Sequence, residues 1–320
     1  MKPTALIFGH DGLDVDVAIN LKHLYQDLGF RVVIAKQLHV ADLLCVIRTP
    51  IRQNSDIFRY SQIHVFDYVC AENIEFLSSL VNHPKSTIFV PSIRRFNHNG
   101  DLNPALEEKM LVLLPPVFTK IWISKKIPKE HFNIVHVGNF KPYYENNTDV
   151  YANRFINQMA NGSVKIWGKG WNKKILQSNI IKPAPLLKVS LIYKSASLAL
   201  GMMYPFQRNY TISGRYWQAP LNGARLITEP NVVAEGIPGV VQSDYIQDLT
   251  KLTNLLNEDS RIQIKKSAKI FWDNHYRESI EIISRITSRH SGNSILCFLT
   301  LLRHLPRNLI RLILIRIRVK

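Results

Sequence analysis

Short apolar runs alternate with stretches of helical periodicity along the first part of the chain. One helical pattern runs from Val15 to Leu28, and another covers Pro104 to Leu114. The apolar runs that we interpret as buried strands are TALIF, RVVIA, DLLCVIR, IHVFDY, STIFVPS and KIWIS. Strands that alternate with helices in this way predict a parallel sheet with helices on both of its faces.

A polar, charged stretch, KKIPKE, interrupts this alternation, and we interpret it as a linker because it contains Pro128. A second alternating block follows. Its apolar runs are FNIVHVGNF, VKIWGKGW, ASLALGM, RLIT and VVQS, and its predicted helices are Val150 to Ala160, Pro185 to Lys194, a helix from about Thr211, and Ile246 to Asn257. The sequence therefore predicts an α/β protein of two tandem Rossmann-like domains, residues 1–125 and 132–260, with a C-terminal helical tail.

Two further segments follow the second domain. Helical periodicity from Arg261 to Arg289 predicts a long helix over residues 261–292 that crosses between the domains. Residues 293–320 are rich in leucine and isoleucine and contain no acidic residue, and their basic residues are Arg303, Arg307, Arg311, Arg316, Arg318 and Lys320. This composition is typical of a basic amphipathic segment on a membrane surface. The alternative is a terminal helix that packs on the first domain or joins a homodimer.

The composition indicates which kind of partner the protein binds and in which compartment it is expected. The 320 residues are 46% hydrophobic and carry a net charge of +17, which predicts a folded protein with an anionic partner. A nucleic acid is the least favoured of these, because the charge is concentrated in the tail and no aromatic residues interleave with it. Cys45, Cys70 and Cys297 lie in apolar runs, and the first apolar run is short for a signal peptide, so we expect a cytoplasmic protein with buried thiols.

Loops after predicted strands are the places where chemistry is expected, because parallel sheets bind ligands at the carboxyl ends of their strands. His10 and Asp11 follow the first strand between two glycines, and we take them as catalytic candidates. The alternative is a tight turn without a ligand. The Gly-x-Gly-x-x-Gly dinucleotide pattern is absent after that strand, which argues against a nicotinamide enzyme. In the second block, Gly138 and Arg208 occupy such loops, and we place them with the donor-binding candidates.

The second block resembles a known family in the order and spacing of its motifs. These are VHVGNF, Arg154, VKIWGKGW, YKSASLALGM, TISGRYWQAPLNGARLITEP, VVQSDYIQDLTKLTNLLNED and FWDNHYRESIEII. Together they resemble the nucleotide-binding domain of GT-B glycosyltransferases, specifically the CgeB-like branch of the enzymes called glycosyl transferases group 1. The resemblance covers roughly Phe132 to Ile283, whereas the first domain is similar only in layout.

The resemblance implies roles for particular residues. The loop GKGW is expected to line the nucleobase pocket through Gly168, Gly170 and Trp171, unless Trp171 is simply part of the core. The stretch TISGR is expected to face the donor diphosphate. Its residues Ser213, Gly214 and Arg215 are the proposed anchor, and the alternative for Arg215 is a solvated arginine on a helix.

This chain departs from the family where its relatives carry two glutamates, since Tyr210 and Gln218 stand at those places. Gln218 is able to hydrogen-bond a ribose diol but supplies no charge. Pro220 is expected to bend or end the helix. Glu229 is a candidate for a replacement carboxylate in the donor site, and its alternative is a solvated loop glutamate.

These observations together predict a glycosyltransferase, a hexosyl- or deoxyhexosyltransferase, that moves a sugar from a nucleotide-diphosphate donor to a surface-glycan or lipid-linked acceptor. No cofactor or metal is expected, and His10 or Asp11 would act as the base of an inverting reaction. The expected location is the inner face of the cytoplasmic membrane, with an anionic membrane surface as a partner. The alternative is a catalytically inactive GT-B relative that binds a glycan or nucleotide sugar as a scaffold, which the changes at Gln218 and Pro220 suggest.

Overall fold

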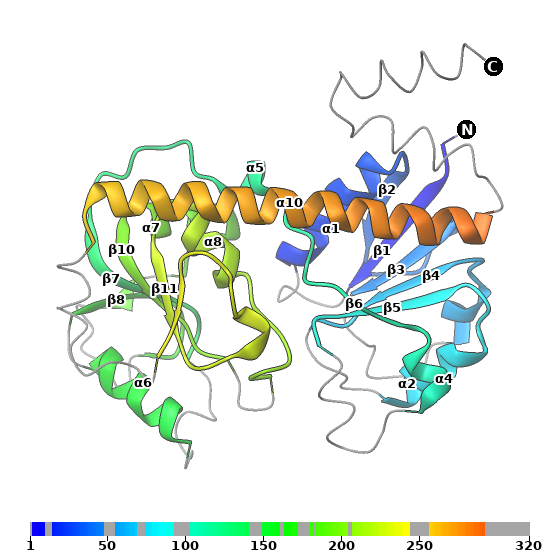
Figure 1. Ribbon diagram of the computed structural model, residues 1–320, viewed down its shortest axis with the longest axis horizontal. Helices are drawn as coiled ribbons and strands as arrows, with labels where there is room; N and C mark the ends of the chain where they lie inside the picture. Colours follow the sequence, from blue (N-terminus) through cyan, green and yellow to red (C-terminus); the bar gives the residue numbers. More distant parts are fainter. Residues whose placement is uncertain are drawn as a thin grey trace, which may run out of the picture.

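The computed structural model of the protein describes residues 2–9, 15–47, 55–68, 74–92, 103–140, 149–160, 163–171, 180–181, 183–203, 207–243 and 256–291. These residues form two α/β domains side by side, joined along one edge by a long helix (Figure 1). The predicted tail, residues 293–320, lies outside the described residues, as do the catalytic candidates His10 and Asp11.

The first domain contains a parallel sheet with the strand order β2-β1-β3-β4-β5-β6. Its elements are β1 (Thr4–Gly9), α1 (Val15–Asp27), β2 (Arg31–Ala35), β3 (Leu43–Ile47), η1 (Ser55–Arg59), β4 (Ile63–Phe66), α2 (Ile74–Ser79), η2 (Leu80–Asn82), β5 (Ser86–Val90), α4 (Pro104–Glu107), β6 (Met110–Val112) and α5 (Thr119–Trp122). Strands β3, β4 and β5 are buried along their whole length, which explains why their sequences are continuous apolar runs.

The second domain repeats this architecture with the strand order β12-β11-β10-β7-β8-β9. Its elements are β7 (Phe132–Val137), α6 (Val150–Ala160), β8 (Val164–Trp167), β9 (Ile180–Ile181), α7 (Leu186–Lys194), β10 (Ala196–Leu200), α8 (Arg215–Leu221), β11 (Arg225–Thr228), η6 (Val232–Ala234) and β12 (Val240–Gln242). All strand pairs in it are parallel. The prediction of an α/β protein with two Rossmann-like sheets is confirmed.

Two predictions for the last part of the first domain are wrong. The helix expected over Pro104 to Leu114 is only one turn, α4, and the chain then pairs with β5 as β6. The strand expected in KIWIS is the short helix α5, whose Trp122 is buried against the second domain. The chain around α5 leads from the first domain to the second. Packing against the second domain determines its conformation there, and the local apolar pattern alone does not predict it.

The long helix α10 (Glu258–Ser291) braces both domains, and in Figure 1 it runs across the top of the two sheets. Trp272 packs edge-to-face on Trp217 of α8, with ring centroids 6.0 Å apart. One turn further on, the Tyr276 hydroxyl donates a hydrogen bond of 2.8 Å to Asp27 of α1. His275 contacts the Leu114 carbonyl at 3.0 Å, so α10 contacts the first domain here as well as α8 of the second.

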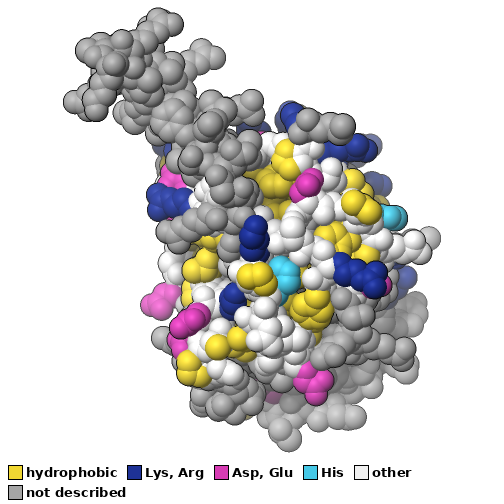
Figure 2. Space-filling view, turned by 90° about the vertical axis from the view of Figure 1, so that its right-hand side faces the viewer, with side chains coloured by type: hydrophobic (Ala, Val, Ile, Leu, Met, Phe, Trp, Pro, Cys, Tyr) yellow, Lys and Arg dark blue, Asp and Glu magenta, His cyan; other side chains and the backbone are white. Residues whose placement is uncertain are grey.

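The described surface at the far end of the first domain is neither mainly hydrophobic nor mainly of one charge. Apolar, basic and acidic side chains are interspersed over the described part of that face (Figure 2). The net charge of +17 therefore does not gather there into one basic patch of described residues. Within the described ranges, we find no helix with the length and apolar character that a membrane span requires.

Candidate functional site

The second sheet has a topological switch point between β7 and β10. The chain moves outward from β7 through β8 to β9, then returns to the other side of β7 and moves outward again from β10 through β11 to β12. The loops that leave the carboxyl ends of β7 and β10 therefore depart in opposite directions. In open parallel sheets, this is the position where ligands bind.

Arg215, the first residue of α8, spans this switch point. Its Nε donates a hydrogen bond of 3.1 Å to the carbonyl of Val137, the last residue of β7. Its Nη1 donates a hydrogen bond of 2.9 Å to the carbonyl of Met202, just after β10. The remaining nitrogen, Nη2, makes no hydrogen bond to the described residues. The guanidinium is thus fixed by two carbonyls, and one nitrogen is left for a ligand.

The glycines around this guanidinium permit close packing of the loops. A Cβ added at Gly138 would lie 3.0 Å from Arg215 Nη2, so a larger residue there would crowd the guanidinium. A Cβ added at Gly168 would collide with the carbonyl oxygen of Gly138, and Gly170 has a φ of +82°. The loops after β7 and β8 therefore pack backbone against backbone, and this close packing requires glycine.

Trp171 belongs to the core below these loops. Its side chain is fully buried, and its Nε1 donates a hydrogen bond of 2.8 Å to the Gly138 carbonyl. The structure therefore favours the core alternative for Trp171, which holds the loop after β7 in place. The nucleobase role of Gly168 and Gly170 stays a prediction.

His136 is a buried titratable residue at this position that the sequence analysis missed. Its Nδ1 lies 2.9 Å from the Leu200 carbonyl, which only accepts, so Nδ1 carries the proton. Its Nε2 is buried and has no partner among the described residues. Burial, and then the nearby Arg215 guanidinium, lower the pKa of His136 to about 3. The imidazole is therefore neutral at pH 7, with an acceptor nitrogen beside Gly138. The sequence signal that could have indicated His136 is a histidine within an apolar strand, shortly before a glycine turn.

The lowered pKa of His136 predicts a loss of stability in mild acid. An unfolded histidine titrates near 6.5, so below that pH the unfolded state binds a proton that folded His136 does not accept. Between about pH 7.5 and about pH 5, this residue should lower the free energy of unfolding by about 2 kcal/mol. In urea unfolding, the free energy of unfolding of His136→Gln should therefore fall by about 2 kcal/mol less than that of the wild type over this pH range. The exposed His131→Gln is the matched control, and an equal slope for wild type and His136→Gln would contradict the prediction.

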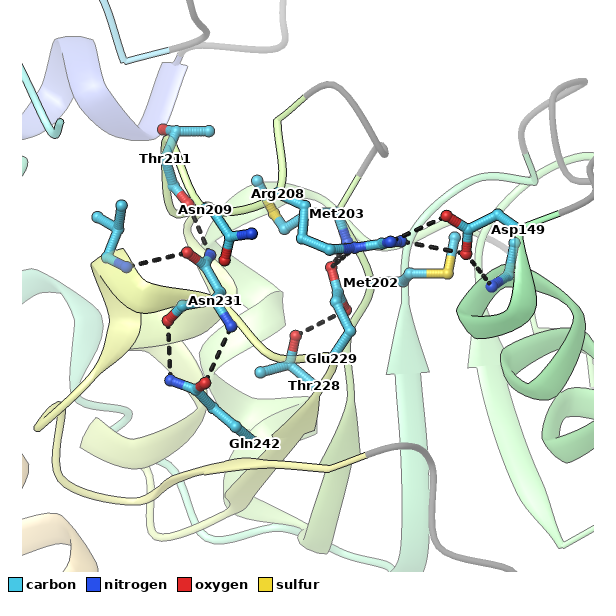
Figure 3. Close-up of polar contacts among 12 residues, drawn as sticks. Asp149, Met202, Met203, Arg208, Asn209, Thr211, Thr228, Glu229, Asn231 and Gln242 are labelled. Carbon is cyan, nitrogen blue, oxygen red and sulfur yellow. Dashed lines mark hydrogen bonds and ion pairs between the residues drawn. The ribbon is translucent and has the colours of Figure 1, made fainter. Parts of the chain in front are cut away.

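A network of charged side chains lies next to Met202 and Met203, the residues after β10 (Figure 3). Glu229, directly after β11, is fully buried, so the alternative of a solvated loop glutamate does not hold, and its role in the donor site stays a prediction. Arg208 binds Asp149 with both Nη atoms, at 2.9 and 3.3 Å, and its Nε lies 3.9 Å from Glu229. The Arg208 guanidinium also lies over the Tyr151 ring. Arg208 is therefore held by carboxylates of its own domain.

The charge on Asp149 is stabilised within this network. Burial alone would raise the pKa of its carboxyl group, but the hydrogen bonds from Arg208 and from the Ala152 N–H outweigh burial and lower it. Asp149 therefore stays ionised at neutral pH and keeps the Arg208 side chain in one orientation. The carboxylate also accepts from the first turn of α6, which joins that helix to the network.

The start of α8 faces the start of α1 in the first domain. A Cβ added at Gly214 would collide with the carboxylate of Asp16, and it would lie 3.0 Å from Gln218 Nε2. Ser213 Oγ is buried without a hydrogen-bond partner among the described residues. Gln218 is only 3% exposed, and α8 ends one residue after Pro220, as the proline predicts. Asp16, in the first turn of α1, is thus a carboxylate that approaches this helix from the first domain.

Comparison with known proteins adds the fold family to this geometry. No protein-family model and no curated protein sequence matches the chain. Among solved structures, it is similar to AviGT4, a glycosyltransferase involved in avilamycin A biosynthesis, with a TM-score of 0.58 and 12% identity over 91% of this chain and 98% of that one. The chain has the GT-B fold.

Two further GT-B enzymes are similar at the same level. One is the DNA-modifying enzyme β-glucosyltransferase, studied with its substrate uridine diphosphoglucose, with a TM-score of 0.55 and 12% identity over 88% of this chain and 99% of that one. The other is an α1,3-fucosyltransferase, with a TM-score of 0.51 and 10% identity over 92% of each chain. Identities this low extend the GT-B assignment to the fold alone, and membership of the CgeB-like branch stays a prediction.

Proposed function

We propose that the protein is a glycosyltransferase that binds a nucleotide-diphosphate sugar at the switch point of its second sheet. The observation that carries the proposal is the Arg215 guanidinium, which two carbonyls fix across β7 and β10 while Nη2 is left without a partner among the described residues. A fixed guanidinium suits a diphosphate because it is always positively charged, and the N–H groups of Nη2 are able to donate charge-assisted hydrogen bonds to phosphate oxygens. No metal takes part in this proposal, since positive charge comes from the side chain.

The acceptor belongs to the first domain in this proposal. An inverting reaction needs a base beside the acceptor hydroxyl. His10 and Asp11 precede α1 in the sequence, and Asp16 in the first turn of α1 approaches Gly214 at the start of α8. We therefore add Asp16 to the two original candidates for the base. The related enzymes modify different acceptors, DNA in one case, so their fold does not select a surface glycan or lipid-linked acceptor.

The inactive scaffold is the second candidate function, and Gln218 favours it. A buried glutamine stands where the family carries a glutamate, so the chain lacks one charge that related sites contain. The two candidates differ in turnover and agree in ligand binding. Release of free nucleotide from a nucleotide sugar, with or without transfer, supports the enzyme, whereas binding without any release supports the scaffold.

A thermal-shift panel of uridine, guanosine, adenosine and cytidine diphosphates and their sugars tests the proposal itself. A ligand at a hundred times its dissociation constant stabilises the folded state by about 2.7 kcal/mol. At least one member should raise the melting temperature, and nucleosides without phosphate should do so much less. Equal shifts with nucleoside and diphosphate, or no shift with any member, would contradict a diphosphate site.

The tail is part of the proposal as a membrane-surface anchor on the inner face of the cytoplasmic membrane. Its six basic residues and its leucine-rich sequence support this role, since each basic residue near an anionic surface contributes roughly 1 kcal/mol. Full-length protein should sediment with anionic vesicles at low salt and be released at high salt. A chain that ends at Ser291 should stay folded and remain in the supernatant, and its equal sedimentation would rule the tail out as the anchor.

A further inference from the structure

The contacts of Glu229 give it a role that its position after β11 does not reveal. Its side chain is fully buried, and Oε1 accepts a hydrogen bond of 2.6 Å from the Met203 N–H. Oε2 accepts one of 2.9 Å from the Thr228 hydroxyl. Both carboxylate oxygens are therefore engaged within the protein, and neither faces a ligand directly.

The first of these contacts leads to the guanidinium of Arg215. The Met203 N–H that Glu229 binds belongs to the turn after β10, and the neighbouring Met202 carbonyl accepts from Arg215 Nη1 at 2.9 Å. Glu229 thus fixes the peptide turn that supplies one of the two carbonyls on which Arg215 is oriented.

The second contact leads to the helix that carries Arg215. Because the Thr228 hydroxyl donates to Glu229, its oxygen accepts from the Tyr216 hydroxyl at 3.1 Å. Tyr216 is the neighbour of Arg215 in α8. Burial, and then the charge of Glu229, raise the pKa of Tyr216 to about 12, so its hydroxyl keeps the proton that it donates.

Arg208 compensates the buried charge of Glu229. Its Nε is 3.9 Å from the carboxylate, and Asp149 holds its other two nitrogens, as Figure 3 shows. A buried carboxylate is costly without a neighbouring cation and hydrogen-bond donors. The Arg208 and Asp149 pair therefore explains how Glu229 stays in place.

We propose that Glu229 is a positioning residue for the donor site, which orients Arg215 by holding both the Met202–Met203 turn and, through Thr228 and Tyr216, helix α8. The role rests on the proposed function, because Arg215 is the group it presents to a donor. Arg208 and Asp149 are the supports of Glu229 in this role.

The test uses full-length protein with Glu229→Leu, Glu229→Gln, and Glu235→Leu as the control at an exposed glutamate of the same loop region. Leucine removes both acceptors and leaves the Met203 N–H without a partner, so affinity for UDP should fall about tenfold. Glutamine keeps an acceptor for Met203 and should restore most of the affinity. Glu235→Leu should bind UDP as the wild type does.

Coupling to Arg215 separates positioning from general destabilisation. In an Arg215→Ala background, Glu229→Leu should cause no further loss of UDP affinity, because the group that it orients is gone. A purely structural residue would instead reduce affinity by the same factor in both backgrounds. Additive losses would therefore overturn the proposal, as would wild-type affinity in a folded Glu229→Leu protein.

A measurement without ligand keeps the proposal testable if UDP does not bind. The Nε–H resonance of Arg215, assigned through Arg215→Lys, reports its hydrogen bond to the Val137 carbonyl. Exchange of this proton with water should be about tenfold faster in Glu229→Leu than in the wild type. If Glu229→Leu does not fold, Thr228→Val breaks the link to Tyr216 and should still increase the exchange. If the exchange rate is unchanged in each variant that folds, the positioning role is overturned. If exchange is faster in the variants but no protein binds UDP, only the proposed function is contradicted.

Discussion

Replacement of Arg215 by alanine is expected to weaken binding of the donor nucleotide by roughly tenfold to a hundredfold, without unfolding the protein. A hydrogen bond to a charged group contributes about 1.5–3 kcal/mol, and Nη2 is the nitrogen available to make it. Isothermal titration with the nucleotide that gives the largest thermal shift measures the change. Arg215→Lys should lie between wild type and alanine, because a single ammonium cannot span two carbonyls and a ligand.

A surface arginine provides the control for this experiment. Arg59 is 81% exposed and pairs with the neighbouring Asp56, so Arg59→Ala changes the net charge by the same amount at a distant position. It should leave nucleotide affinity within twofold at moderate salt, about the precision of such titrations. If Arg59→Ala and Arg215→Ala bind equally well, the site at the switch point is wrong even though the fold stands.

The sheets were predictable from the sequence because burial determines their composition. Strands such as β3 and β4 are covered on both faces, so nearly every residue in them is apolar, and the run itself marks the strand. Strand β9 was missed because its two residues, Ile180 and Ile181, are too few for any periodicity. Helix α8 begins at Arg215, four residues after the predicted start at Thr211, and the Thr211 hydroxyl binds the Tyr68 carbonyl of the first domain.

The site was only partly predictable, for a different physical reason. Arg215 and the glycines of the strand-end loops follow from local sequence, because a turn at the end of a strand places them at the sheet edge. The network around Arg208 does not, since Asp149 is 59 residues away in the chain. Whether Glu229 is solvated or positions other residues depends on its burial, and the sequence around Glu229 does not show that it is buried.

The burial that fixes the site also depends on α10, which lies outside both sheets. Trp272 of α10 is fully buried, and its ring packs on Trp217 of α8 at a centroid distance of 6.0 Å and on Phe271 at 5.0 Å. Helix α8 carries Arg215 on one side and Trp217 on the other. Loss of the packing on Trp217 should therefore affect both the stability of the protein and the donor site.

Trp272→Ala is expected to lower the free energy of unfolding by about 3–5 kcal/mol, the usual cost of removing a buried indole and leaving a cavity. Urea unfolding followed by circular dichroism measures it. Ile270→Ala, on the same helix but 54% exposed, is the control and should change stability by less than about 0.5 kcal/mol. Where the Trp272→Ala protein remains folded, its nucleotide affinity should also fall, because α8 has lost the support that faces away from Arg215. A change below about 1 kcal/mol would mean that α10 does not brace α8, and that Arg215 is held by the contacts of the strand-end loops alone.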